Sequence, residues 1–323
     1  IMAATVAASK SYDLSGGALR EDLESIIWDI SPQDTWFMNS IDKVAAKSTL
    51  HEWLSDVLVS PAQNAKVEGD AFTAVARTLP SRLKSYTQIS RKEFEVTGTA
   101  QKVDKAGMKE LLGYHTARAG KEIKRDIEVS LLGAYVSTAG SSVLARTTSG
   151  AENWCYTDNH IKLTNQTTST TVAPSSGLAG AVTAGSTTAV TETNLKSGLQ
   201  QAWSCGGDVT TLCVGPSLYN TISGFTGLAT RFRDVGSRSQ AQIIGAADVY
   251  VSAFGAHTIR LSRYCSSTTI LGLDMTAWAF ASLRPFQTID IAKVGDADRR
   301  MLLAEYALVC KTPTANFKIT GAS

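Results

Sequence analysis

The sequence predicts an α+β protein in which one long helix lies on a β-sheet and a mixed α/β module follows. Three observations support this. Apolar or small residues recur about every four positions over residues 104–135, which is typical of one face of a helix. Two β-like segments, 47–59 and 85–99, precede that helix. After it, short strands alternate with helical segments, as in α/β modules.

The composition fits a chain with a large core and no dedicated nucleic-acid or membrane surface. Of the 323 residues, 43% are hydrophobic, so the chain can bury a core in two or three modules. The net charge is +2 with interleaved signs, whereas a nucleic-acid-binding domain usually presents a basic face. No apolar run approaches the roughly 18 residues of a membrane helix, so we expect no membrane contact. The five scattered cysteines suit reduced, mostly buried thiols in a cytoplasmic setting.

Residues 1–46 are predicted to form an N-terminal arm with a short helix. The helix is expected to end before Pro32, because the residue before proline avoids the helical conformation. Aromatic residues then cluster in a segment too short to enclose its own core, so they need another surface. The arm residues predicted to contact another subunit are Trp28, Trp36 and Phe37.

Residues 47–100 are predicted to form an extended hairpin with its tip at residues 68–70. Two strands alone are marginally stable in water, so we expect them to rest on a neighbouring subunit. Every charge over residues 71–92 is positive, which fits a solvated basic edge, a DNA contact or pairing with acidic residues of a neighbour. The predicted interface residues of this hairpin are Trp53, Arg82, Lys84, Tyr86 and Arg91.

Residues 101–145 contain the long helix. We expect Asp104 to cap its first turn and Gly140 to end it, which would make it roughly 50 Å long at 1.5 Å per residue. Its charged residues lie on the other faces, so Lys124 is expected to face solvent. The residues expected to face the sheet are Ile123, Ile127 and Leu131.

Three further segments complete the chain. Residues 146–192 are predicted to form a Ser/Thr/Gly-rich β insertion, which is uncharged over 163–191. Residues 193–285 are predicted to form a mixed α/β module, in which Ser217 caps a short helix. Residues 286–323 are predicted to form strands that return to the sheet under the long helix.

The sequence holds no specific motif for catalysis, a metal or a cofactor. Cys205 and Cys213 are spaced C-x7-C, which is not a zinc-ligand spacing, and the histidines are isolated. Neither a P-loop nor a G-x-G-x-x-G after a strand occurs. Ser217 stands in a segment one residue short of a G-x-S-x-G elbow, so a hydrolase that uses Ser217 or a cysteine remains an alternative function.

Five motifs follow one another in the first half of the chain. They are REDLESIIWDISPQDTWFMNSI, KVAAKSTLHEW, EGD, YTQISRKEFEVTGT and EIKRDIE. In this order, over residues 19–133, they resemble one family of tailed-phage major capsid (major head) proteins, which have the Johnson fold. The second half resembles that family in its architecture alone, and residues 163–191 do not align with it.

The resemblance implies a structural protein, not an enzyme, that needs no cofactor and self-assembles into hexamers and pentamers of an icosahedral head around double-stranded DNA. It implies a spine helix on the inner side, a hairpin (E-loop) over a neighbouring subunit and an axial domain at the capsomer centre. The implied partners are other copies, neighbouring capsomers and weakly bound DNA, and the resemblance also allows scaffolding, portal and decoration proteins. The protein would assemble in the host cytoplasm and reside in the virion. An encapsulin-type cellular shell of the same fold is the alternative.

Overall fold

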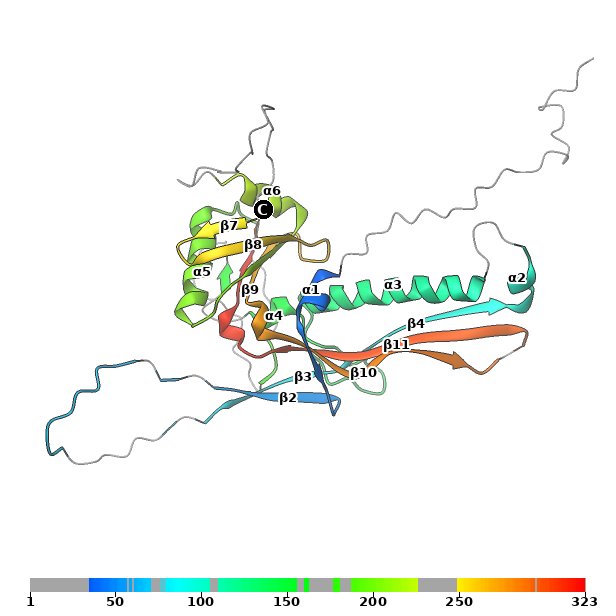
Figure 1. The fold of residues 1–323 in the computed structure, drawn as a ribbon, viewed down its shortest axis with the longest axis horizontal. Helices are drawn as coiled ribbons and strands as arrows, with labels where there is room; N and C mark the ends of the chain where they lie inside the picture. Colours follow the sequence, from blue (N-terminus) through cyan, green and yellow to red (C-terminus); the bar gives the residue numbers. More distant parts are fainter. Residues whose placement is uncertain are drawn as a thin grey trace, which may run out of the picture.

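The computed structural model describes residues 35–322 except 57, 60, 71–76, 78, 105–109, 156–159, 163–176, 181–186, 226–248 and 294. The helix expected before Pro32, Trp28 and most of the uncharged insertion therefore lie outside the described residues. The remainder forms two sheets, and a two-stranded hairpin projects from them (Figure 1).

A four-stranded sheet with the order β1-β10-β11-β4 forms the first module. The strands are β1 (Asp42–Ala45), β10 (Trp278–Ile291), β11 (Ala297–Cys310) and β4 (Gln88–Thr97). The long antiparallel strands β10 and β11 are joined by a turn at Gly295, whose φ of +74° suits glycine. The short helix α2 (Gly98–Lys102) follows β4, and the helix α3 (Leu111–Leu132) lies along the sheet (Figure 1).

The helix α3 is shorter than its apolar pattern predicts. It has 22 residues, which is about 33 Å at 1.5 Å per residue. The expected boundaries are wrong, because the helix begins at Leu111 and its C-cap is Gly133 rather than Gly140. Beyond Gly133 the chain runs extended and returns so closely that a Cβ on Gly150 would overlap the Gly133 carbonyl. That backbone crossing stops the helix before the periodic pattern ends.

The predicted buried face of α3 is confirmed. Ile123, Ile127 and Leu131 are all buried in one cluster with side chains of β10 and β11, whereas Lys124 is exposed. Lys92 of β4 reaches Asp126 of α3 at 2.7 Å, which adds an exposed ion pair beside the apolar contact. The apolar stripe therefore holds the helix on the sheet, and the charged residues other than the buried Glu128 face outward.

Truncating this stripe should destabilise the subunit. The change Ile127→Ala is expected to cost about 2–5 kcal/mol of folding free energy, because the site is fully buried and a cavity would remain. Lys124→Ala, one turn away and exposed, should change the free energy of unfolding by less than about 0.5 kcal/mol. Denaturant unfolding of both variants measures the difference, and equal losses would contradict the assignment of faces.

A six-stranded sheet with the order β5-β12-β9-β6-β8-β7 forms the second module. The strands are β5 (His160–Lys162), β12 (Phe317–Thr320), β9 (Thr269–Leu273), β6 (Thr211–Val214), β8 (Gly255–Leu261) and β7 (Val249–Ser252). Helices α5 (Glu192–Ser204) and α6 (Pro216–Ser223) pack on it. Phe317 lies so close to Gly198 of α5 and Gly272 of β9 that a Cβ on either glycine would clash with its ring.

Three expectations about these segments are wrong. Residues 85–99 are not one hairpin strand: β2 (Leu50–Ser55) pairs with β3 (Ser81–Tyr86), whereas β4 pairs with β11. Residues 286–323 do not all return to the sheet under the helix, since β12 joins the six-stranded sheet. Ser217 is not a cap, because Gly215 holds that position and Pro216 is the first helical residue.

A buried lysine lies where the two modules meet. Lys318 of β12 is fully buried, and its Nζ donates to the carbonyl oxygen of Glu152 at 2.9 Å. Glu152 belongs to the short helix α4 (Ala151–Trp154) that follows the segment after α3. Burial lowers the pKa of Lys318 to about 8, although the Cys155 and Glu152 charges oppose the shift. Burying the charged form of Lys318 therefore costs folding free energy, although its hydrogen bond to Glu152 links the two modules.

Replacing this lysine should stabilise the subunit at neutral pH. Because the folded pKa lies below the unfolded value of 10.5, the unfolded chain binds more protons, and stability rises with pH between about 8 and 10.5. Lys318→Met should raise the unfolding free energy by about 1–3 kcal/mol at pH 7, with the gain shrinking as pH approaches 10.5. Thermal unfolding of Lys318→Met between pH 7 and pH 10.5 measures this gain. The control is Lys196→Met, which removes a lysine from the exposed face of α5. A gain that does not depend on pH would contradict the assignment.

Candidate assembly surfaces

The loop between β2 and β3 projects from the body of the molecule (Figure 1). We call residues 56–80 the hairpin excursion. It carries apolar side chains almost fully in water: Leu58 at 91%, Val59 at 77%, Val67 at 80% and Leu79 at 87% exposed. Exposed apolar side chains gathered on one projecting segment mark an interaction surface rather than a core.

The tip of the excursion is a tight turn with two acidic residues. The amide of Asp70 donates to the carbonyl of Val67 at 3.1 Å, and Gly69 has a φ of +84°. Nothing would meet a Cβ on Gly69, so the glycine serves the backbone conformation and not a close contact. The turn presents the carboxylates of Glu68 and Asp70 beside an exposed valine.

The base of the hairpin has an outward and an inward face. On β3, Arg82, Lys84 and Tyr86 alternate with the buried Leu83 and Ser85. These three predicted interface residues therefore share the outer face. Two neighbours complete that face across the strand pair: the register places Leu54 opposite Arg82 and Glu52 opposite Lys84.

Trp53, which was predicted to contact another subunit, lies on the inner face of the hairpin base and is partly buried against its own chain. Its indole Nε1 donates to the carbonyl of Cys310 at 2.9 Å, and its ring centroid lies 5.4 Å from that of Trp154. Both the indole ring and its N–H group therefore have partners within the same chain. Trp53 holds the hairpin base on the body.

Three basic residues of the positive segment, Arg82, Arg91 and Lys92, have acidic partners in their own chain. Arg82 lies 3.6 Å from Glu52, and Arg91, on β4, lies 3.1 Å from Glu93. Lys92 pairs with Asp126 as described above. Exposed pairs of this kind contribute little to stability, but they reduce the charge offered to a neighbour. Because part of its charge is paired within the chain, the positive segment has less need of an acidic surface on a neighbouring subunit than the sequence alone suggests.

The aromatic residues of the arm that the structure describes pack on the body. Phe37 of α1 (Trp36–Ser40) is 0% exposed, and its ring centroid lies 5.8 Å from that of Trp278. The expectation that Phe37 waits for another subunit is wrong, because the chain supplies its core. Trp36 is half-buried against the same cluster.

A buried carboxylate on α3 holds this part of the arm. The Glu128 oxygens accept hydrogen bonds from the backbone amides of Phe37 at 2.7 Å and of Met38 at 2.9 Å. Amides in the first turn of a helix lack intrahelical partners, so a carboxylate there caps the helix. Glu128 therefore anchors α1 to the long helix, a role that the sequence did not reveal.

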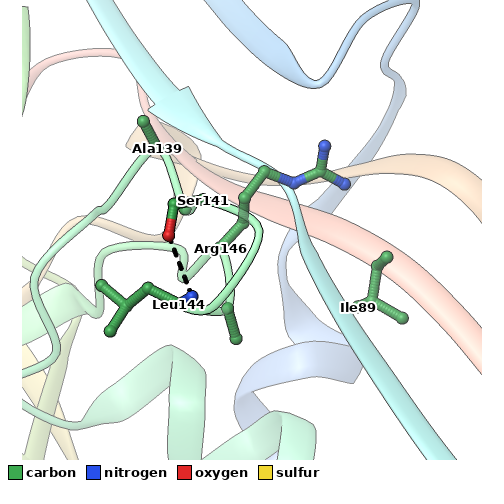
Figure 2. A pocket seen from close by; sticks show the side chains of 7 residues that line it. Ile89, Ala139, Ser141, Leu144 and Arg146 are labelled. Carbon is green, nitrogen blue, oxygen red and sulfur yellow. Dashed lines mark hydrogen bonds between the residues drawn. The ribbon is translucent and has the colours of Figure 1, made fainter.

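A concavity of about 490 Å³ lies between β4 and the loop that follows α3. It is lined by Ile89, Ala139, Gly140, Ser141, Leu144, Ala145 and Arg146 (Figure 2). The Ser141 hydroxyl accepts from the amide of Leu144 at 3.0 Å, which fixes the turn that presents this leucine. Leu144 is 62% exposed although it lines the concavity. We call this feature the Leu144 concavity.

An ionic network around the buried carboxylate of Glu305 supports one wall of the Leu144 concavity. Glu305 of β11 accepts from Arg146 at 2.6 Å, from Arg284 at 2.8 Å and from the Thr87 hydroxyl at 2.9 Å. Two guanidinium groups share one carboxylate, so the network keeps one net positive charge beside the concavity. Sequence reasoning missed this site, and the only local signal was the Val-Leu pair inside a Ser/Gly-rich turn.

The described residues offer little for catalysis or metal binding. The Ser217 hydroxyl donates to the Ser267 carbonyl at 3.4 Å. A Ser–His contact occurs elsewhere: Ser252 Oγ lies 2.7 Å from His257 Nε2, while His257 Nδ1 lies 2.6 Å from the Val209 carbonyl. The Phe254 amide also donates to Ser252, so this pair pins the β7–β8 turn.

The described part of the chain shows neither a metal-binding cluster nor a membrane-spanning helix. Its His, Cys, Asp and Glu side chains form no group of three or more that could hold a metal ion. Its helices include none that is both long and apolar enough to cross a membrane. Cys205 is exposed, whereas the other four cysteines are buried, as expected.

Comparison with known proteins shows which family has this sequence and fold. The model of the SU10 major capsid protein family matches residues 4–323. The major capsid protein of Escherichia phage Phieco32 is 37% identical over 130 residues, which is 40% of this chain and 36% of that protein's length.

Solved structures show the same fold at low sequence identity. The Cyanophage A-1(L) capsid subunit gives a TM-score of 0.70 at 11% identity over 94% of this chain and 97% of that one. A chain from the capsid of a native GTA particle gives 0.64 at 11% identity, covering 98% and 100%. A chain of Gordonia phage Cozz gives 0.60 at 13% identity, covering 100% and 99%.

Proposed function

The chain belongs to the SU10 major capsid protein family, and from this premise we propose that it forms the shell of a phage head. Copies would associate into hexamers and pentamers of an icosahedral capsid around double-stranded DNA, and the protein would reside in the virion. The family match over residues 4–323 supports a phage capsid over the encapsulin-type shell. The weak net charge of +2 suits containment of DNA without tight binding.

The observation that carries this proposal is the hairpin excursion. It exposes four large apolar side chains on a segment that extends beyond the body (Figure 1). Such a segment adds no stability to a monomer. In a lattice it can form one contact for every subunit, and many modest contacts together stabilise the shell. The revised proposal places five residues at the interface between subunits: Arg82, Lys84 and Tyr86 at the hairpin base, Arg91 of β4 and Trp36 of the arm. Trp28 stays a prediction.

Electron microscopy and sedimentation of the purified chain test the proposal. We expect closed shells, or sheets and tubes with a hexameric lattice, at high protein concentration. A folded chain that remains monomeric across the accessible concentration range would contradict it. Shells of one small size that retain protein cargo but no nuclease-protected DNA after phage production would favour the encapsulin alternative.

We propose no catalytic role for the chain. The Ser217 hydroxyl contacts a backbone carbonyl and not a base, which favours a structural serine. A fluorophosphonate probe should therefore leave Ser217 unlabelled in the folded protein. Stoichiometric labelling of Ser217 would restore the hydrolase alternative.

A further inference from the structure

Resting on the proposed function, we infer that the Leu144 concavity receives the hairpin tip of a neighbouring copy. The tip is the turn from Val67 to Asp70, and the receiving surface lies between Ile89 of β4 and the loop that carries Leu144 and Arg146. The inference names both sides of one contact within the lattice.

The two surfaces match in size and polarity. The concavity holds about 490 Å³, room for a few side chains, and Ile89, Leu144 and two alanines supply apolar wall (Figure 2). Leu144 and Val67 are 62% and 80% exposed, so each leaves apolar area in water that the contact would remove. The Ser141 hydrogen bond and the turn at Gly69 hold both backbones in shape before they meet.

The charges match as well. The network of Arg146, Arg284 and Glu305 keeps one net positive charge, and a guanidinium has five donors, more than one shared carboxylate can accept. The tip presents Glu68 and Asp70 directly beside Val67. Complementary charges at the rim of an apolar contact set its register and speed its formation.

A hairpin tip that fills the concavity must come from another copy, because the hairpin holds a subunit's own tip away from its own concavity. Ile89 lies just past the end of β3, at the base of the hairpin, whereas Val67 lies at the far end of the excursion. The six residues of β3 alone separate base from tip by roughly 20 Å. Figure 1 shows the excursion leading away from the body.

Cysteine trapping tests the contact in assembled shells. In a Cys205→Ser background, which removes the one exposed cysteine of the described chain, Val67→Cys is combined with Leu144→Cys. Oxidised glutathione then converts two thiols into one disulfide and is itself reduced. We expect covalent multimers on non-reducing gels from shells, and none from unassembled subunits.

The matched control replaces the neighbouring residue. Val143 is 93% exposed in the same loop but does not line the concavity, so Val67→Cys with Val143→Cys should give few multimers. Shells that cross-link equally at both positions, or at neither, would overturn the inference and leave the proposed function standing. Absence of any assembly by the wild-type chain would instead remove the proposed function.

A second pair of variants covers the case in which the cysteine variants fail to assemble. Leu144→Asp should lower shell yield at least about tenfold, because the contact would bury a carboxylate against Val67 and place it beside the like charges of Glu68 and Asp70. Val143→Asp should assemble like the wild type. Equal yields from the two aspartate variants, with both subunits folded by circular dichroism, would overturn the inference.

Discussion

Replacing residues 58–79 with a short Gly/Ser turn is expected to give folded, soluble subunits that no longer form closed shells. The side chains that the structure describes in this segment are exposed and belong to no core cluster, while β2 and β3 stay on the body through Trp53. The free energy of unfolding should therefore stay within about 0.5 kcal/mol of the wild type. Particle yield should fall to background, because every subunit loses its projecting contact at once.

Circular dichroism during thermal unfolding, sedimentation and electron microscopy measure both halves of this prediction. The matched control replaces only residues 61–65 with Gly/Ser at constant length, which spares the four exposed apolar residues and the tip. That control should assemble normally. Normal shells from the shortened hairpin would mean that the excursion only decorates the surface, and the connecting role would pass to the N-terminal arm.

Glu128→Ala is expected to cost about 2–6 kcal/mol of folding free energy, at about 1–3 kcal/mol for each buried donor left unpaired. The carboxylate is fully buried and accepts from two backbone amides, so its loss leaves both donors unpaired inside the protein. The first effect should appear at α1, whose helix start loses its cap while Phe37 remains in the core. Denaturant unfolding gives the total, and limited proteolysis near residue 35 reports local release of the arm.

Glu122→Ala is the control on the same helix. Glu122 forms an exposed ion pair with Arg118 at 3.0 Å, and such pairs contribute about 0.3–0.5 kcal/mol. Glu128→Gln should fall between the two variants, since the amide keeps one oxygen acceptor but turns a donor toward a donor. If Glu128→Ala unfolds at the same denaturant concentration as Glu122→Ala, Glu128 is not the anchor of the arm.

The local periodicity of the sequence was sufficient for several features. The buried stripe of α3, the strand Thr211–Val214 and the turn at Gly69 each follow from residues a few positions apart. Helical and strand periods act within a short window, so the faces they define do not depend on distant parts of the chain. The ordered motifs of the first half also indicated the Johnson fold, which the family match and the structural similarities show.

Tertiary structure decided which surfaces remain free. Trp53 looks like an interface aromatic in the sequence, yet its N–H bonds to Cys310, 257 residues away. The same holds for Phe37, which Glu128 and Trp278 enclose, and for Glu305, which brings Arg146 and Arg284 together. The Leu144 concavity forms only where the loop after α3 lies beside β4. Burial and pairing depend on partners that chain folding brings from far along the sequence, so no local pattern can specify them.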